Sequence, residues 1–452
     1  MFLVVLAVCG FVSYFAVPTV MANEEVLATD SHPETAEDLE GPLKSGFKKR
    51  PAAPDSLFGS ATEWLDRQPE PIRGTEFGYD ARSYYFDRRN SSSSKSKAWT
   101  GGGQLTYTSG WWKNLALSAN YYMSEEIHAP NDKPGTGLLR PNNDNINVLG
   151  EINLRLRIPE KYGGIQARVG RQRLDLPFVN KHDIRAVPAS HEGIIVERRD
   201  SKLDFIVGYL TQFKDYDSNE FVDMSEAAGA LETNKGVALI GARTTLLKNF
   251  TLGAINYFGE DTFDSFYTEG EYHGRLGDEL DFRVSGQYTR QSSTGDELIG
   301  DFNTDAGGVR LALGWQDFVF KVAATTTSND FGVQKPWGGT PSYLSIQRLD
   351  FDRAGENAYS LGVSYNAERW VDGLSGFVTV AYGSDAEAPD TGIDLPDRNE
   401  FDLTIDYKPK NGILRGFWIR ARANFIAIEG DDEDIGDIRD FRVIVNYPIR
   451  LF

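Results

Sequence analysis

The chain has 452 residues, a formal net charge of −19 and a single cysteine, and 12% of its residues are aromatic. The acidic balance argues against a nucleic-acid-binding protein, because such a protein presents a basic surface to the phosphates. The lone Cys9 excludes an intramolecular disulfide framework and a cysteine-based metal site.

Residues 1–22 contain no charged side chain and form an apolar run that ends at Ala22. This composition predicts a secretory signal peptide that is cleaved near Ala22. A single membrane anchor is the alternative, and Gly10 and Pro18 disfavour it because they interrupt a run that is already short. Residues 23–73 are first acidic, then basic and then rich in proline, which predicts a periplasmic extension. The alternative for this segment is a plug that fills the lumen of a barrel.

Residues 74–452 consist of segments of about 8 to 12 residues in which apolar and polar side chains alternate, a period that is typical of β-strands. We therefore predict an all-β fold, a transmembrane antiparallel β-barrel of about 18 strands. The predicted strands are 77–87, 100–109, 115–124, 147–157, 164–173, 191–198, 203–212, 236–245, 250–258, 264–274, 280–290, 306–314, 317–327, 357–366, 373–383, 400–407, 416–427 and 440–451.

The connections between these strands alternate in length along the chain. Those after even-numbered strands are short, as at 158–163 and 199–202, whereas those after odd-numbered strands are mostly long, as at 174–190 and 328–356. The short connection at 259–263 is an exception. Outer-membrane barrels have short periplasmic turns and long extracellular loops, so the alternation favours this class over a soluble β-sandwich.

The last segment, residues 441–452, also alternates and ends with the aromatic Phe452. Such a segment is typical of the closing strand of an outer-membrane barrel, which turns one face to lipid and the other to the lumen. We expect the barrel-assembly machinery to recognise this strand. We also expect the outer wall to contact outer-membrane lipid and lipopolysaccharide.

The alternation assigns each arginine either to the lipid face or to the lumen. Arg155 and Arg157 have the opposite parity to the apolar residues Ile152, Leu154 and Leu156, so they face inward. At the lipid midplane, each arginine would cost about 2–4 kcal/mol. The same rule predicts a lumenal row that consists of Arg82, Arg155, Arg157, Arg168, Arg283, Arg310, Arg420, Arg422 and Arg442.

This row predicts a path for small anions, because a guanidinium group binds a carboxylate through two parallel hydrogen bonds. The alternative is that these arginines only pair with Asp and Glu side chains across the lumen.

Residues 174–190 are too apolar and too rich in proline for a free extracellular loop. We predict that they fold into the barrel and narrow the channel, with Asp183 and Arg185 at the constriction. The alternative is a rim loop that packs on its neighbours. A second long loop, at 328–356, is predicted to contribute Asp350 and Arg353.

The sequence predicts no catalytic residues, no metal site and no cofactor. The chain has five histidines without a ligand spacing, so His182 and His191 are interpreted as structural. The serines do not lie in a nucleophile-elbow context. The acidic run at 429–434 is interpreted as a solvated rim loop, with divalent-cation binding as the alternative.

Several short stretches resemble those of the OprD-type substrate-specific outer-membrane porins. They are Ala81-Arg-Ser-Tyr-Tyr-Phe86, Val169-Gly-Arg-Gln172 with Leu176-Pro177, Asp183-Ile-Arg185 with Pro188 and His191-Glu-Gly193, Phe351-Asp-Arg-Ala-Gly-Glu356 and Val445-Asn-Tyr-Pro448. The resemblance implies an 18-stranded barrel that admits small solutes, often carboxylates. It also implies that 174–190 and 328–356 are the third and seventh loops, which form the family's constriction, and that the lumenal arginines match its row of basic residues.

These patterns together predict a porin for the passive, selective uptake of small anionic nutrients, without catalysis. The alternatives are an outer-membrane lipid-modifying enzyme and a closed structural barrel. The sequence names neither the solute nor the oligomeric state.

Overall fold

The computed structural model of the protein describes residues 64–65, 67–90, 95–158, 164–198, 203–277, 279–389, 391–429 and 437–451. The predicted signal peptide, the extension up to residue 63 and most of the acidic run at 429–434 lie outside the described residues, so those interpretations stay predictions. Within the described part of the chain, no helix is both long and apolar enough to cross a membrane.

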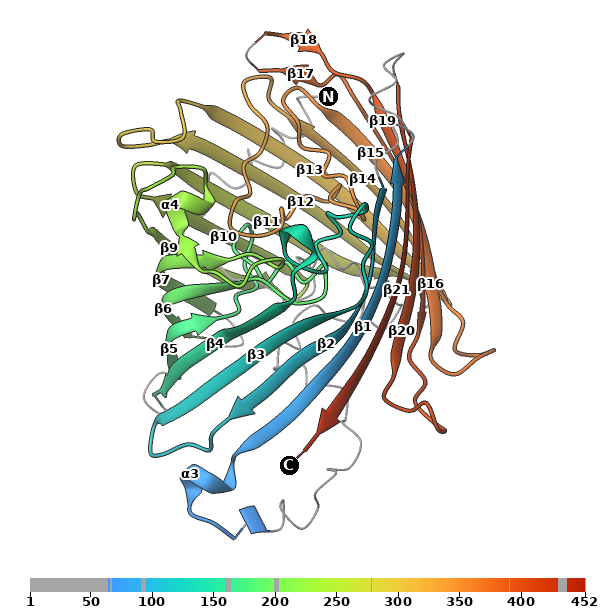
Figure 1. Ribbon diagram of the computed structural model, residues 1–452. Helices are drawn as coiled ribbons and strands as arrows, with labels where there is room; N and C mark the ends of the chain where they lie inside the picture. The colour runs from blue at the N-terminus through green and yellow to red at the C-terminus, as the bar shows by residue number, and fades with distance from the viewer. Residues whose placement is uncertain are drawn as a thin grey trace.

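Eighteen long strands form one closed antiparallel barrel, which confirms the predicted fold and strand number (Figure 1). Each predicted strand is present, with ends that differ by a few residues. The strands are β1 (Glu76–Asn90), β2 (Lys95–Thr108), β3 (Leu115–His128), β4 (Ile146–Arg157), β5 (Ile165–Gln172), β6 (Ser190–Arg198), β7 (Leu203–Lys214), β9 (Val237–Leu247), β10 (Phe250–Gly259), β11 (Phe263–Leu276), β12 (Leu280–Ser293), β13 (Asn303–Trp315), β14 (Phe318–Thr327), β15 (Asn357–Asn366), β16 (Leu374–Ser384), β19 (Arg398–Tyr407), β20 (Trp418–Ile428) and β21 (Ile438–Arg450).

The remaining elements are short and belong to the connections. They are α3 (Glu70–Arg73), η2 (Pro141–Asn143), β8 (Val222–Asp223), α4 (Met224–Ala227), β17 (Glu387–Ala388) and β18 (Ile393–Asp394).

The barrel closes where β1 pairs with β21. The register of this seam runs from Gly78 opposite Arg450 to Asn90 opposite Ile438. The last strand thus pairs with the first over almost its whole length, as the alternating C-terminal segment predicts.

The two faces of the barrel wall follow the alternation of the sequence. In β4, the apolar side chains of Ile152, Leu154 and Leu156 point outward and are 38–43% exposed. Side chains of the opposite parity, such as Asn153, are buried on the inner side. An apolar outer wall and a polar lumen are the two faces that a barrel needs in a membrane.

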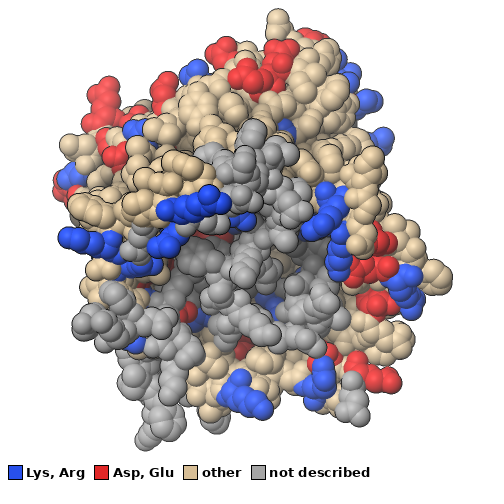
Figure 2. All heavy atoms as spheres, turned by 90° about the horizontal axis from the view of Figure 1, so that it is seen from below, with Lys and Arg blue, Asp and Glu red and all other residues tan. Residues whose placement is uncertain are grey.

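The connections divide between two ends of the barrel, which we call the short-turn rim and the long-loop rim. The short-turn rim includes the two-residue turn at 248–249 between β9 and β10. The long-loop rim includes the connections at 129–145, 173–189 and 328–356, and also the three-residue turn at 260–262 that the sequence marks as an exception. Figure 2, seen from the short-turn rim, shows both basic and acidic side chains around this end.

The main apolar core lies inside the barrel, where long loops pack on the wall. Leu176, Phe178 and Val179 from one loop and Trp337 from another join a buried cluster that includes the wall residue Tyr257. Figure 1 shows loop segments inside the barrel at mid-height. The loops thus narrow the interior from the long-loop rim.

Candidate functional site: the loop constriction and the lumenal arginines

The β5–β6 loop, residues 173–189, folds into the barrel, as its apolar composition predicts. Leu176, Phe178 and Val179 are buried, and the hydroxyl of Tyr257 on β10 donates a hydrogen bond to the carbonyl of Pro177. Burying these side chains favours the inward position, because it removes apolar surface from water.

The β14–β15 loop, residues 328–356, packs against the β5–β6 loop inside the barrel. The Asn180 amide donates to the carbonyl of Gly339 at 2.8 Å and accepts from the Gly339 N–H at 2.9 Å. The indole of Trp337 donates to the carbonyl of Met224 in α4 at 2.8 Å and stacks on Phe263, with the ring centroids 4.8 Å apart. The two loops that were assigned to the constriction therefore form one packed unit.

This junction gives a first testable prediction. Replacing Asn180 by alanine removes both hydrogen bonds to Gly339, and an unsatisfied buried polar group costs about 1–3 kcal/mol. We expect single-channel currents of Asn180→Ala to be larger and noisier than those of the parent, because the loops separate. Asn329→Ala is a matched control, since Asn329 lies in the β14–β15 loop, which also contains Gly339, but bonds to Glu387 at the exposed rim. Identical currents in Asn180→Ala and the parent would show that the junction does not limit the channel.

Asp183, one of the predicted constriction residues, lies beside Arg82 of β1. Arg82 Nη1 is 2.6 Å from Asp183 Oδ1 and 2.9 Å from the carbonyl of Arg185, and Arg82 Nε donates to Asn446 of β21 at 2.8 Å. Arg82 therefore fastens the β5–β6 loop to the wall next to the seam.

Arg185 lies on the same side of the lumen and is only 7% exposed. Its Nε donates to the carbonyl of Thr136 at 2.9 Å, which joins the β5–β6 loop to the β3–β4 loop at 129–145. Burial and the nearby Arg442 lower the pKa of the Arg185 guanidinium from its ordinary value.

Five arginines from four parts of the chain gather here, and we call Arg82, Arg88, Arg185, Arg348 and Arg442 the constriction arginines. Three of them surround the buried ring of Phe86: the guanidinium carbons of Arg88, Arg185 and Arg442 lie 4.8, 5.4 and 5.2 Å from its centroid.

Asp440 pairs with Arg442 at 2.8 Å and with Arg88 at 3.2 Å, and Asp183 pairs with Arg82. The carboxylates of Asp215 and Asp217, in the loop after β7, interact with Arg185 over a longer range.

Arg348 is a site residue that the sequence analysis missed. It lies in the β14–β15 loop, its side chain is exposed, and it is close enough to Arg88 and Tyr216 to interact electrostatically with both. The carbonyl of Gln347, the residue before Arg348, accepts a hydrogen bond from Arg442 at 3.5 Å. Loop residues have no alternation rule, so no local signal distinguishes Arg348 from the other charged residues of this loop.

The wall strand β19 holds this part of the β14–β15 loop through its carboxylates. Glu400 accepts hydrogen bonds from the N–H groups of Arg348 and Leu349 at 2.8 and 2.7 Å. Asp402 accepts one from the N–H of Gln347 at 3.0 Å. The position of Arg348 is therefore fixed through the backbone, which leaves its side chain available to the lumen.

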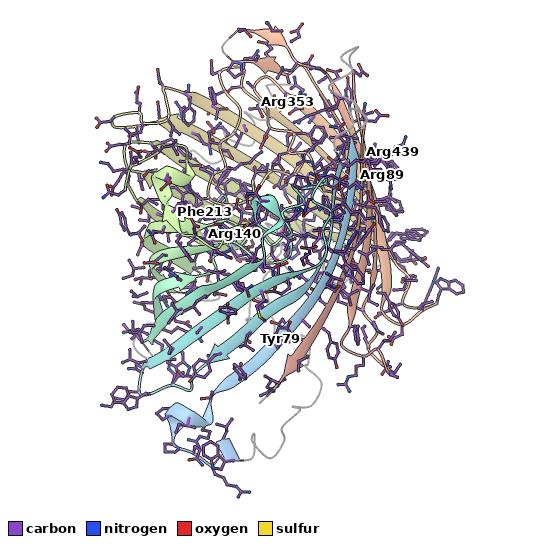
Figure 3. The ribbon with its side chains drawn as sticks, viewed as in Figure 1. Tyr79, Arg89, Arg140, Phe213, Arg353 and Arg439 are labelled. Carbon is purple, nitrogen blue, oxygen red and sulfur yellow. The ribbon has the colours of Figure 1, made fainter. Side chains whose placement is uncertain are left out.

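Asp350 and Arg353, the other predicted constriction residues, do not lie together. The Lys335 ammonium bridges Asp350 at 2.9 Å and Asp352 at 2.6 Å. Arg353 lies near the long-loop rim (Figure 3), where it pairs with Glu356 at 2.8 Å and donates to the carbonyl of Pro396. Asp350 thus belongs to the ion pairs within the loop, whereas Arg353 connects the loop to Pro396 near the rim.

The arginines of β4 and β5 form a second group on the inner wall. Arg155 and Arg157 lie over the indole ring of Trp111, with guanidinium carbons 5.2 and 4.2 Å from its centroid. Arg155 also donates to Ser118 at 3.4 Å. Arg168 pairs with Glu197 of β6 at 3.5 Å.

The remaining predicted arginines lie on the inner wall close to carboxylates, and all of them except the half-buried Arg310 are buried. Arg283 and Arg310 approach Glu271 at 3.5 and 3.9 Å. Arg420 forms a two-point ion pair with Asp406, with both nitrogen–oxygen distances at 2.9 Å. Opposite Arg442 in the β20–β21 register lies Arg422, which is 3% exposed.

The lumen therefore carries acidic groups as well as the arginines that parity placed there. The acidic ones include Glu271 and, at alternate positions of β19, Glu400, Asp402 and Asp406. The same alternation rule, applied to Asp and Glu, would have found them. Among the described residues, no group of three or more His, Cys, Asp or Glu side chains is arranged to hold a metal ion.

A closed barrel with an apolar outer wall, a charged lumen and loops packed inside it defines a channel-forming membrane protein. The sequence pattern that defines the outer membrane porins of the OprD family matches residues 71–451, so the chain belongs to this family, as the short motifs indicate. It is accordingly a protein of the bacterial outer membrane and a channel, not an enzyme.

Individual relatives agree with this assignment. Porin D of Pseudomonas aeruginosa is 24% identical over 441 residues, which cover 88% of this chain and 97% of that protein. The crystal structure of OccK9 (OpdG) from P. aeruginosa has a TM-score of 0.77 at 19% identity and covers 85% of this chain and 100% of its own.

Two further solved structures share the fold. OccAB2 of Acinetobacter baumannii has a TM-score of 0.76 at 20% identity, with coverage of 85% and 100%. OpdK of P. aeruginosa, solved with vanillate, has a TM-score of 0.74 at 20% identity, with coverage of 83% and 99%.

Proposed function

We propose that this porin mediates the passive, selective uptake of small anionic solutes that carry a carboxylate. The observation that carries the proposal is the group of constriction arginines, five guanidinium groups that lie together at the packed loops, where Arg82 pairs with Asp183 and Arg88 and Arg442 share Asp440. The chain is similar to OpdK, which was solved with vanillate, an aromatic carboxylate.

The geometry suggests how an anion would pass. The packed loops at 173–189 and 328–356 contact β1 and β21 at the constriction arginines, so an anion that passes on this side of the lumen meets these arginines. Arg348 is exposed there, and a guanidinium group binds a carboxylate through two parallel hydrogen bonds. Arg155 and Arg157 of β4 offer further positive charge on the inner wall. Several comparable sites in sequence let a bound ion move on.

The outer wall supports a second part of the proposal, which concerns partners. Its exposed apolar residues fit outer-membrane lipid, and we propose lipopolysaccharide as a partner at the long-loop rim. We also propose that the barrel-assembly machinery recognises the closing strand β21.

A planar-bilayer experiment tests the transport proposal. The purified protein is placed between unequal salt concentrations, and the reversal potential gives the ratio of anion to cation permeability. We expect anion preference, and we expect vanillate to block the current at lower concentrations than its uncharged amide. Cation preference, or equal block by the acid and the amide, would contradict the anionic part. Absence of any conductance would instead favour the closed-barrel alternative.

A pH dependence follows from Asp215. Burial raises the pKa of this carboxyl to about 6, and the nearby Asp217 also raises it, so Asp215 loses its negative charge as the pH falls from 7 to 5. Because Asp215 interacts with Arg185, the constriction becomes more positive, and we expect anion selectivity to rise over this window. His182 does not titrate there, since burial and Arg185 lower its pKa to about 4. Selectivity that rises with acid as steeply in Asp215→Asn as in the parent would exclude Asp215 as the source.

A further inference from the structure

Three basic residues form a row across the outer face of the barrel at the seam. In the strand register, Arg89 of β1 lies directly opposite Arg439 of β21 on one side and Lys95 of β2 on the other. Residues directly opposite each other in antiparallel strands have Cα atoms about 4.5–5.5 Å apart and side chains on the same face. Figure 3 shows Arg89 and Arg439 close together at the side of the barrel.

The row lies on the outer face, not in the lumen. Arg89 shares its parity with Tyr85, and Arg439 shares its parity with Phe441, which is 47% exposed. The side chain of Arg89 itself is 69% exposed. Neighbours of opposite parity, such as Arg88, face the lumen and belong to the constriction arginines.

The charges of the row are poorly balanced by the strands that carry it. Lys97 of β2 adds a fourth cation one step below the row, opposite Asp87. Asp87 lies 3.2 Å from Arg89 and 3.8 Å from Lys97, and within β21, β1 and β2 it is the one carboxylate on the outer face at this end. The exposed Asp437, directly before β21, has the same parity as Arg439, so two described carboxylates stand against four cations. Like charges that are directly opposite in a sheet are destabilising, so an anion that lies between them would relieve the repulsion.

Aromatic side chains show the depth of the row in the membrane. Tyr85, Trp99 and Phe441 point outward just below it, and the rings of Tyr85 and Phe441 are in edge-to-face contact with centroids 6.4 Å apart. Aromatic girdles mark the membrane–water interface of barrels. Arg89 and Lys95 lie four residues beyond Tyr85 and Trp99, which is about 13 Å along a strand. The row therefore lies at the level of lipid headgroups.

We propose that Arg89, Lys95, Lys97 and Arg439 form a binding site for the phosphate groups of lipopolysaccharide in the outer leaflet. The long-loop rim of an outer-membrane barrel faces the cell exterior. The phosphorylated glycolipid of that leaflet brings several negative charges to the depth at which these side chains lie. Guanidinium and ammonium groups bind phosphate through charge-assisted hydrogen bonds. The inference rests on the outer-membrane location of the porin, and it does not depend on which solute the lumen carries.

Binding of lipopolysaccharide by the full-length protein tests this site. The protein is titrated with bisphosphorylated lipopolysaccharide, and with the same lipid after enzymatic removal of its phosphates, and bound lipid is measured by native mass spectrometry. For the triple variant Arg89→Gln, Lys95→Gln, Arg439→Gln we expect roughly 100-fold weaker binding, since each basic residue near a charged lipid surface contributes about fivefold. The parent should bind the dephosphorylated lipid about as weakly.

A matched control removes three exposed cations at the short-turn rim, with Arg369→Gln, Lys410→Gln and Arg415→Gln. This control should bind the phosphorylated lipid like the parent. Equal affinity of the triple variant and the parent would overturn the proposal, as would an equal loss in the control. Equal affinity of the parent for the two lipids would do so too. Unchanged conductance and anion preference of the triple variant would show that the lumen is intact, so failure of the lipid site and failure of the transport proposal are distinguishable.

Discussion

Replacement of Arg348 by glutamate is expected to lower anion permeability by about 30-fold at low salt. Arg348 is the exposed member of the constriction arginines, so a passing anion can reach it. A pair of unit charges about 4 Å apart in water interacts with about 1 kcal/mol. The change from a positive to a negative charge removes this attraction and adds an equal repulsion, a difference of about 2 kcal/mol. This free-energy difference corresponds to a ratio of about 30 in anion permeability. The measurement is the reversal potential in a salt gradient.

The fold should tolerate the change, because the loop is held through the backbone N–H groups of Arg348 and Leu349. Arg348→Gln should give an intermediate permeability, and high salt should reduce both effects by screening. Arg415→Glu, an exposed residue of the turn at 408–417, makes the same change of charge at the opposite rim. If Arg415→Glu lowers anion permeability as much as Arg348→Glu, the effect is general electrostatics and not a property of the constriction.

The barrel could be predicted from the sequence because its main constraint is local. Each strand must present apolar side chains to lipid and polar ones to the lumen, so a period of two is visible without any knowledge of the strand's neighbours. This is why the sequence predicts all eighteen strands, and why it predicts the face on which Arg283, Arg420 and Arg442 lie.

The partners of these arginines depend on the register between strands, which single-strand alternation does not reveal. Arg420 meets Asp406 because the two are directly opposite in the β19–β20 register. Arg442 is different, since its partner Asp440 lies two residues away on the same strand and could have been noticed. Alternation applied to the arginines alone therefore predicts a lumen that is more positive than the one observed, in which Glu271, Glu400, Asp402 and Asp406 also face inward.

The loops were predictable in composition but not in path. The apolar side chains of 174–190 correctly indicated an inward loop, because they need a place out of water. The contact of Asn180 with Gly339 joins residues 159 positions apart, and no local pattern encodes it. Within 328–356, the backbone path turns Arg348 toward the constriction and Arg353 toward the rim, although both residues are equally charged in the sequence.

Arg420 and Arg155 share a face of the wall by parity but should respond differently to mutation. Arg420 and Asp406 form a two-point ion pair whose side chains are 0% and 1% exposed, and Trp418 also donates to Asp406. Removing one partner of a buried pair leaves an uncompensated charge and costs about 3–5 kcal/mol. We therefore expect Arg420→Met and Asp406→Leu each to lower the free energy of unfolding by about this amount. The measurement is urea-induced unfolding from lipid vesicles, followed by tryptophan fluorescence.

The double variant should recover most of the loss, because replacing both partners of a buried pair by apolar residues is often neutral. Arg155→Met provides the contrast, since Arg155 lies over Trp111 and donates a long hydrogen bond to Ser118. Its loss should change the free energy of unfolding by about 0.5–1.5 kcal/mol, the usual range for a hydrogen bond, and act mainly on anion permeability. Single variants at Arg420 and Asp406 that unfold like the parent would mean that the pair is hydrated in the lumen. In that case Arg420 would be available to passing anions, like Arg155.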